Sequence, residues 1–161
     1  MTREVIGLLL LLIVPAFALA AYVGVRRARV KQEGSLPAPV GVERADSLVH
    51  DDGLYVSTVL AESPLTRVWA HGLGVRGRVK LVSKDAGLEV HRQGEASFVI
   101  PTAQIVGLDK ASATIDKAVE SNGLFSIVWL LGQTQLVSNF RIPNQTTRQQ
   151  ISHQITNKLG A

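Results

Sequence analysis

Three glycines in the chain have the spacing of a nucleotide-binding fingerprint. Gly72, Gly74 and Gly77 stand as G-x-G-x-x-G within the stretch AHGLGVRGRVKLVSKDAG. In that fingerprint a strand leads into the glycines and a helix opens after them, because the pyrophosphate binds at the N-terminus of the helix. Here apolar and basic residues alternate from Val75 onward, which is the period of a half-buried strand. We therefore predict that the glycines allow a tight entry into a strand and bind no nucleotide.

The other residue types that perform catalysis do not form a recognisable set. His50, Asp51 and Asp52 are adjacent, and the remaining three histidines are scattered along the chain. The sequence contains no H-E-x-x-H motif, no G-x-S-x-G nucleophile elbow and no cysteine. An adjacent His-Asp-Asp is more typical of a solvated entry to a strand than of a metal site. The sequence therefore predicts no enzyme, no cofactor and no metal.

A second set of chemically informative residues is basic. Arg76, Arg78 and Lys80 occupy alternate positions of the strand predicted from Val75, so their side chains project from one face. Three cations on one face suit the head groups of anionic lipids or a protein partner. Alternatively, they form a solvated strand face that prevents aggregation at a sheet edge, and the sequence favours this second interpretation.

An uncharged apolar segment near the N-terminus determines where these residues are held. The 21 residues of VIGLLLLLIVPAFALAAYVGV, positions 5–25, are enough to cross a hydrocarbon core of roughly 30 Å. We predict a transmembrane helix from Val5 to Val25 that contacts the lipid bilayer, with a short extracytoplasmic N-terminus at 1–4. A cleaved signal peptide is the alternative, because Ala18-Leu19-Ala20 has the small-x-small pattern of a cleavage site.

Basic residues follow the apolar segment directly. Arg26, Arg27, Arg29 and Lys31 lie on its C-terminal side, whereas the N-terminal side carries one arginine offset by one glutamate. The positive-inside rule then predicts a single-pass protein of the cell membrane whose C-terminal domain is cytoplasmic. In that topology the four cations lie at the membrane surface, where they are attracted to anionic lipid.

The remainder of the chain is electrically neutral. From residue 32 to residue 161 there are 12 Lys and Arg and 12 Asp and Glu, so the net charge of +4 comes from the membrane flank. A pI of 9.8 therefore does not indicate a nucleic-acid partner, and we predict none.

A linker and one folded domain follow the apolar segment. Residues 26–47 are predicted as a basic juxtamembrane segment that becomes a partly extended linker from Gln32, because Pro37 and Pro39 break any helix. The domain is predicted at 48–161 with six to seven antiparallel strands. The strand-like runs are 53–61, 75–83, 88–92, 97–100, 104–109, 124–131 and 134–142.

Turn residues organise these runs. The Asp-Ala-Gly at 85–87 predicts a hairpin, and Gly132-Gln133 predicts a second one with the glycine a type II′ turn requires. Pro101 is expected to interrupt the pairing. The apolar run 124–131 suggests a strand covered on both faces. Residues 63–74 are predicted as a loop that carries Trp69 into the core, where Trp129 is also expected.

The end of the chain changes to a helical period. Ile151, Ile155 and Leu159 recur every four residues, and the glycine that follows them marks a stop. Thr147 with Gln150 has the form of a capping box. Strands closed by one amphipathic helix give an α+β, mostly β fold class.

Several of these stretches together carry a resemblance to a known family. YVSTVL, RVWAHGLGVRGR, IPTAQIVGL and DKAVESNGLFSIVWLLG, followed by Phe140-Arg141 and preceded by one transmembrane segment, resemble the single-pass membrane proteins of actinobacteria that carry a bacterial PH-like domain. The resemblance implies two roughly orthogonal sheets closed by a C-terminal helix. It also leads us to expect a glycine, and a bulge, where this chain has Ser138-Asn139. It supplies no catalytic residues.

Function is then predicted from location and fold. The leading hypothesis is a non-enzymatic protein-interaction or scaffolding module at the cytoplasmic face of the membrane, with an unknown protein partner. The alternative is recognition of anionic lipid head groups by Arg76, Arg78 and Lys80. A third hypothesis, an accessory subunit of a transport or export system, follows from labels used in the family, although one transmembrane helix cannot by itself form a transport path.

Overall fold

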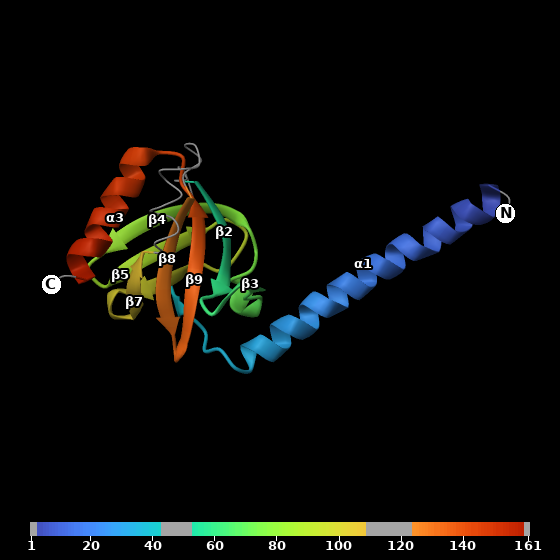
Figure 1. The fold of residues 1–161 in the computed structure, drawn as a ribbon, viewed down its shortest axis with the longest axis horizontal. Helices are drawn as coiled ribbons and strands as arrows, with labels where there is room; N and C mark the ends of the chain where they lie inside the picture. The colour runs from blue at the N-terminus through green and yellow to red at the C-terminus, as the bar shows by residue number, and fades with distance from the viewer. Residues whose placement is uncertain (1–2, 43–52, 109–123, 160–161) are drawn as a thin grey trace.

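The computed structural model of the protein describes residues 3–42, 53–108 and 124–159. It shows a long N-terminal helix and, beyond it, a sheet domain closed by a C-terminal helix (Figure 1). The mostly β fold with one apolar helix at the N-terminus and one helix at the C-terminus confirms the predicted fold class.

The first helix, α1 (Arg3–Glu33), is longer than predicted. It contains the apolar segment and continues through the basic cluster, so the linker expected from Gln32 begins only at Gly34. Leu11, Val14 and Phe17 are exposed, and the helix packs no apolar side against the domain over this stretch. Within Leu11–Glu33 an 18-residue window has a mean hydropathy of 1.6, so by length and composition the helix could cross a membrane.

The described part of the domain forms one nine-stranded antiparallel sheet. The strands are β1 (Val40–Gly41), β2 (Gly53–Leu60), β3 (Ser63–Arg67), β4 (Gly77–Lys84), β5 (Gly87–Arg92), β6 (Phe98–Pro101), β7 (Ile105–Leu108), β8 (Leu124–Leu131) and β9 (Thr134–Arg141). Their order is β1-β6-β5-β4-β2-β9-β8-β7, and β3 pairs with β2 outside this path. Two short 3-10 helices, η1 (Ala70–Gly72) and η2 (Thr102–Gln104), interrupt the strands, and α3 (Gln145–Leu159) ends the domain.

Strand β2 connects the two halves of the sheet. Its residues Gly53–Tyr55 pair with β4 on one side, while the strand pairs along its length with β9 on the other. The resemblance had implied two sheets, and the hydrogen bonding instead makes one sheet that folds over at β2 so that its halves enclose the core (Figure 1).

Seven of the nine strands correspond to the predicted runs. The two unpredicted ones, β1 and β3, lack the signals of a half-buried strand. β1 has two residues, and β3 contains Pro64 and is almost wholly exposed, with Leu65 at 99%. Both form because a neighbouring strand offers an edge, β6 for β1 and β2 for β3.

The predicted turns are present. β4 and β5 form a hairpin with Lys84 opposite Gly87, and β8 and β9 form one in which Gly132 has φ of +63°. Such a φ favours glycine and suits a primed hairpin turn. Pro101 ends β6 before η2, as expected. The irregularity near Ser138-Asn139 lies on β2, where Val56 is the extra residue opposite β9.

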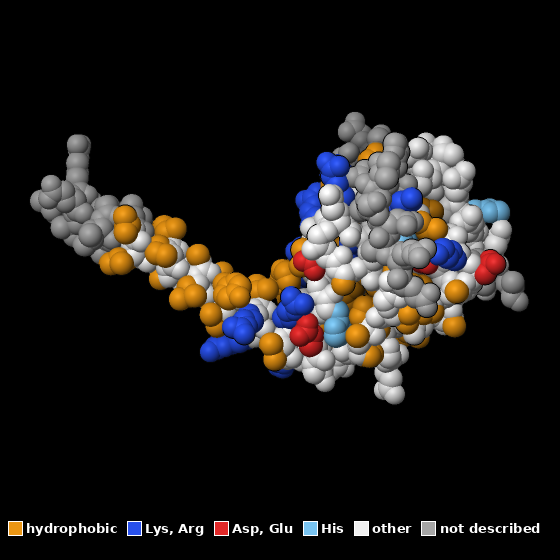
Figure 2. All heavy atoms as spheres, turned by 180° about the vertical axis from the view of Figure 1, so that it is seen from behind, with side chains coloured by type: hydrophobic (Ala, Val, Ile, Leu, Met, Phe, Trp, Pro, Cys, Tyr) orange, Lys and Arg blue, Asp and Glu red, His pale blue; other side chains and the backbone are white. Residues whose placement is uncertain are grey.

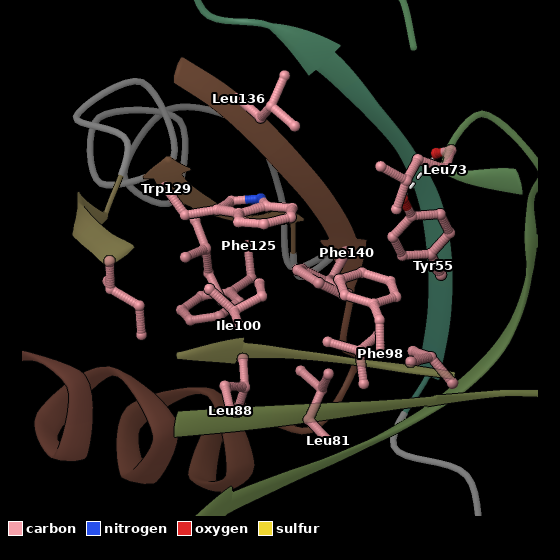
Figure 3. Close-up of a cluster of buried hydrophobic side chains, with 14 of the residues drawn as sticks. Tyr55, Leu73, Leu81, Leu88, Phe98, Ile100, Phe125, Trp129, Leu136 and Phe140 are labelled. Carbon is pink, nitrogen blue, oxygen red and sulfur yellow. Dashed lines mark hydrogen bonds between the residues drawn. The ribbon is translucent and has the colours of Figure 1, made fainter. Parts of the chain in front are cut away.

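The core is rich in aromatic rings. Tyr55, Phe98, Trp129 and Phe140 are at most 2% exposed and meet at the centre of the domain (Figure 3). Tyr55 lies edge-on to Phe140 with ring centroids 5.5 Å apart, and Phe98 stacks on Trp129 at 6.0 Å. Such contacts add about 0.5–1.5 kcal/mol each to the burial of the rings. Trp129 thus lies in the core as predicted.

A chain of hydrogen bonds crosses this core. Trp129 Nε1 donates to Ser138 Oγ at 2.9 Å, and Thr58 Oγ1 lies 2.6 Å from both Ser138 Oγ and the Tyr55 hydroxyl. Tyr55 in turn donates to the carbonyl of Leu73 at 2.6 Å. An indole only donates and a carbonyl only accepts, so the donors must all point from Trp129 toward Leu73. Burial raises the pKa of Tyr55 to about 12, which keeps this hydroxyl protonated.

Helix α3 closes the domain over β7 and η2. Ile151 and Ile155 are buried, as their spacing predicts, but Leu159 is 43% exposed. The capping box predicted at Thr147 is wrong: the helix begins at Gln145, and Asn144 Oδ1 accepts hydrogen bonds from the backbone N–H groups of Thr146 and Thr147. The predicted stop after Leu159 lies outside the described residues.

One face of β8 differs from the prediction. The run was expected to be covered on both faces, and its inner residues Ile127 and Trp129 are indeed fully buried. On the outer face, however, Val128 is half-buried and Leu130 is 37% exposed. An apolar strand thus has one face that the described part of the chain leaves partly open.

Candidate functional site

The glycines of the nucleotide fingerprint serve the backbone. Gly72 ends η1 with φ of +71°, Gly74 lies against the ring of Trp69, where a Cβ would come within 2.8 Å, and Gly77 begins β4. A strand follows them, as predicted, and β4 offers no helix N-terminus to a phosphate.

In the part of the chain that the structure describes, no three His, Asp or Glu side chains lie close enough together to bind a metal ion. His50, Asp51 and Asp52 lie outside the described residues. His153 is exposed on α3.

The end of α1 is joined to the domain by Gln32. Its Oε1 accepts from the backbone N–H groups of Trp69 and Ala70, and its Nε2 donates to the carbonyl of Arg67 at 3.2 Å. The first N–H groups of a short helix have no partner within that helix, and Gln32 supplies one for η1. Both the oxygen and the nitrogen of the Gln32 side-chain amide are therefore hydrogen-bonded to the domain, which fixes where α1 meets it.

Glu33 adds a second contact to this joint. Its Oε1 accepts from the backbone N–H of His71 at 3.2 Å and from Arg29 Nε at 2.8 Å. Arg29, predicted to contact the membrane surface, is therefore half of an ion pair one turn away on the same helix. His71 has φ of +52°, a left-handed conformation that is uncommon for a residue other than glycine.

The chain after α1 remains packed against the domain. The ring Nε2 of His71 lies 3.0 Å from the carbonyl of Leu36, and the Leu36 side chain is only 6% exposed. Pro37 lies against Gly132 in the β8–β9 turn, where a Cβ on the glycine would come within 3.2 Å of the proline ring. The segment predicted as an extended linker thus begins with a docked turn. We call the contacts of Gln32, Glu33 and Leu36 with the domain the joint.

Trp69 lies at this joint and not in the core, where we had predicted it. Its ring is only half-buried, whereas the neighbouring Val68 and Ala70 are fully buried. The guanidinium of Arg67 lies 5.4 Å from the centroid of the indole ring, and Arg67 Nη1 is 3.4 Å from the carbonyl of Gly74. The tryptophan therefore presents an aromatic face beside the end of α1.

Arg92 clamps the other side of η1. It is 6% exposed, and its guanidinium donates to the carbonyls of Gly72 at 2.8 Å and Ala96 at 2.7 and 3.0 Å. It also lies over the rings of Tyr55 and Phe98 at 4.9 and 5.3 Å. Burial lowers the pKa of this arginine from its ordinary value. Through Arg92 the joint is connected to the aromatic core.

The three cations predicted on one strand are divided by the start of β4. Arg78 and Lys80 lie on the outer face of β4, but Arg76 precedes the strand, which begins at Gly77. Arg76 and Arg78 are exposed, and Lys80 is half-buried opposite His91. The prediction of one shared strand face therefore holds for Arg78 and Lys80, while Arg76 lies in the connection from η1.

An acidic residue on β5 changes the charge of that outer face. Glu89 binds Lys84 Nζ through Oε1 at 2.6 Å and His91 Nε2 through Oε2 at 2.9 Å. The hydrogen bond from Lys84, followed by that from His91, holds the pKa of Glu89 below its ordinary value. Glu89 adds a carboxylate between the basic residues, so the outer face of the β4–β5 hairpin is mixed in charge.

Basic side chains also gather on one flank of the domain. Figure 2 shows Lys and Arg on the side that faces back along α1. Arg76 lies in the connection from η1 to β4. Because η1 contacts α1, this connection begins next to the joint. Arg26, Arg27 and Lys31 are exposed on α1 itself. Basic side chains of the domain and of α1 thus lie on the same side of the molecule (Figure 2).

The joint and the Arg92 clamp were not predicted from the sequence. A glutamine and a glutamate at a helix end carry no motif, and their partners lie 35 to 38 positions away in the chain. The available signal was the helical pattern itself, since the segment RRARVKQE contains no helix breaker before Gly34.

Comparison with known proteins identifies the domain. The model of the family described as bacterial PH domain-like matches residues 33–156, which are most of the chain. Searches among curated proteins and among solved structures found no match. PH-like domains are generally not catalytic. The chain therefore belongs to the bacterial PH domain-like family.

Proposed function

We propose that the protein is a non-enzymatic scaffolding module that α1 anchors in the cell membrane and that presents its PH-like domain to another protein at the cytoplasmic face. The observation that carries this proposal is the joint. A flexible linker would let the domain sample many orientations, and partner binding would then cost the entropy of ordering it. Gln32 and Glu33 instead hold η1 by backbone hydrogen bonds, so the domain is presented in one orientation.

The position of the joint also sets the distance from the membrane. Gln32 lies seven residues beyond Val25, the last residue of the predicted span, which is about 10 Å along a helix. The domain is thus held next to the head groups. This geometry suits a partner that is itself a membrane protein or that works at the membrane surface. The basic cluster after the apolar segment supports the cytoplasmic orientation.

The test compares the neighbours of the full chain with and without the joint. A proximity-labelling enzyme is fused after Ala161, and the labelled proteins are compared between wild type and the double variant Gln32→Ala, Glu33→Ala. Val30→Ala, a change at an exposed residue within one turn of Gln32, serves as the matched control. We expect a small set of proteins labelled by wild type and by the control, and at least severalfold less by the double variant. Identical labelling by all three, and by α1 carrying an unrelated domain, would contradict the proposal.

A second candidate function is contact with anionic head groups, which the basic flank favours. Arg76 and Arg78 are exposed, and the flank in Figure 2 faces back along α1, toward a membrane that α1 would span. Each cation near an anionic surface contributes about 1 kcal/mol.

This candidate is tested by hydrogen exchange of the full chain in nanodiscs. We expect slower exchange in β4 and in the connection before it when phosphatidylglycerol replaces phosphatidylcholine, and loss of the effect in the variant Arg76→Gln, Arg78→Gln, Lys80→Gln. The effect should weaken at high salt, because exposed charges are screened. Equal exchange in the two lipids would exclude the contact.

A further inference from the structure

On β2, β8 and β9 the described outer face of the sheet carries one ionisable residue, Arg141 at the end of β9, and none before it. Alternation of the buried positions assigns to this face the residues Ser57 and Val59 of β2, Ser126, Val128 and Leu130 of β8, and Gln135, Val137 and Asn139 of β9. We call these eight residues the uncharged face.

Its centre is a row of apolar side chains. Val59 lies opposite Val137, which lies opposite Val128 on the third strand, so three valines are direct cross-strand neighbours. Leu130 extends the row and is 37% exposed. On β7, beyond β8, Val106 is 50% exposed. Antiparallel sheets that face water normally carry polar residues on the outer side. A continuous apolar patch there marks an interaction surface.

The surroundings of this row resemble the rim of an interface. Arg67 on β3 lies opposite Val59, and Arg141 ends β9 on the same outer side, so two cations stand at the edges of the uncharged face. Around the valines are hydroxyl and amide groups, including Gln135 and Asn139. An apolar centre with a polar rim is the usual arrangement of a protein interface.

The composition of the uncharged face suits a copy of itself. A twofold interface brings the same patch from each subunit together, so any charge at its centre would meet the same charge. The uncharged face avoids this repulsion. Ser57 and Ser126 are buried, and Ser126 donates to Asn139 Oδ1. The amides of Gln135 and Asn139 both donate and accept hydrogen bonds, so each can pair with its own kind. A carboxylate or an ammonium group could not.

The orientation of the uncharged face also fits a second anchored copy. In Figure 1, α1 runs across the picture, while β8 and β9 lie in the front layer of the domain with β4 and β5 behind them. The outer side of β8 and β9 therefore points away from the core, toward the viewer and not along α1 (Figure 1). When α1 spans the membrane, this face looks sideways along the membrane surface.

We propose that the uncharged face binds the same face of a second copy of this chain, around a twofold axis that runs roughly parallel to α1. Both anchors then cross the membrane in the same direction. The inference rests on the proposed function, the anchored interaction module, and names its partner. Confinement to one membrane raises the effective concentration of the two faces, so a modest patch is sufficient for pairing.

The pairing is tested by cross-linking the full-length protein in phosphatidylcholine liposomes. The chain has no cysteine, so a single Val137→Cys, at the middle of the row, reports on its own neighbourhood. A short bismaleimide should join two copies through this position. The matched control is Gln154→Cys, which is exposed on α3. We expect at least tenfold more cross-linked dimer from Val137→Cys, and this excess should persist when lipid is added to dilute the protein.

A charge on the uncharged face should separate the copies. Leu130→Lys, added to Val137→Cys, places two ammonium groups together and should reduce the cross-linked dimer at least tenfold. Its side chain is partly exposed, so the thermal midpoint of the monomer should stay close to that of Gln154→Lys. Mixing Leu130→Lys with Leu130→Glu copies should restore the cross-link, because the charges are then opposite. Equal cross-linking of Val137→Cys and Gln154→Cys, or no response to Leu130→Lys, would overturn the proposal.

Failure of this inference can be separated from failure of the proposed function. If Val137→Cys in native membranes joins a single different protein and Leu130→Lys abolishes that product, self-association is wrong while the interaction module stands. If the dimer forms but proximity labelling does not depend on the joint, the pairing stands and the scaffolding function fails.

Discussion

Removal of the hydroxyl of Ser138 should destabilise the domain through the indole of Trp129. Ser138 Oγ accepts from Trp129 Nε1 at 2.9 Å, and both residues are fully buried. Ser138→Ala therefore leaves a buried N–H without its acceptor, which costs about 1–3 kcal/mol, whereas the change in volume is small. Thr58 loses a donor but still donates to Tyr55, so it adds little. We expect a loss of about 2 kcal/mol in the free energy of unfolding.

The assay is thermal and urea unfolding of the full-length protein in detergent micelles. About 2 kcal/mol corresponds to a fall of roughly 6–12 °C in Tm for a domain of this size. Ser126→Ala is the matched control, because Ser126 is equally buried but donates to Asn139, a half-buried side chain that can turn to water. It should cost under about 1 kcal/mol.

A double-mutant cycle isolates the hydrogen bond itself. In a Trp129→Phe background no indole N–H is present, so Ser138→Ala should cost at least about 1 kcal/mol less than in wild type. Equal costs in the two backgrounds, or a Ser138→Ala no less stable than Ser126→Ala, would refute the assigned direction of the hydrogen-bond chain.

Three further changes test other contacts by the same unfolding assay. Arg92→Lys should cost about 1–3 kcal/mol, because an ammonium group cannot reproduce the planar donors that serve two carbonyls; unchanged stability would exclude the clamp. Lys84 holds the pKa of the Glu89 carboxyl below 4.5, so the contribution of this carboxylate to the free energy of unfolding is present above pH 4.5 and is lost as the pH falls. Glu89→Gln removes that contribution. The stability difference from wild type should shrink as the pH falls below 4.5, and a constant difference would count against the pairing. Asn144→Ala should lower the free energy of unfolding by about 1 kcal/mol and Thr147→Ala by much less, since only Asn144 caps α3. A larger loss for Thr147→Ala would support the predicted capping box instead.

The parts of the fold that depend on local chemistry could be predicted from the sequence. Gly132 specifies a hairpin because few residues adopt its φ, and the four-residue period of Ile151 and Ile155 specifies a helix with one buried side. Pro101 ends a strand for an equally local reason. These signals lie within a few residues of the structure they determine, so no knowledge of distant contacts is needed.

One local choice and the parts that depend on distant contacts could not be predicted from the sequence. The cap of α3 was assigned to Thr147, although Asn144, three residues earlier, is an equally good capping residue, and the sequence alone does not choose between them. Trp69 was expected in the core on hydrophobicity, but its place is decided by Gln32 and Arg67, which hold its backbone and ring at the end of α1. The joint itself exists only because residues more than 30 positions apart meet.

The uncharged face shows how a mismatch between prediction and structure can be informative. The apolar run 124–131 predicted a strand covered on both faces, and the structure leaves Val128 and Leu130 partly open. Local pattern and tertiary environment disagree at these two residues, and the proposed second copy would cover them.

The central claim is that α1 and the PH-like domain form one rigid unit, and a distance measurement tests it most directly. Spin labels are attached to the cysteine-free chain at Val30→Cys and Val106→Cys, both exposed, in nanodiscs that contain one labelled copy diluted with unlabelled protein. We predict a single narrow distance distribution for this protein, and a broad one when Gln32→Ala and Glu33→Ala are added. A distribution that is already broad with the joint intact would show that the domain moves independently of its anchor and would contradict the account.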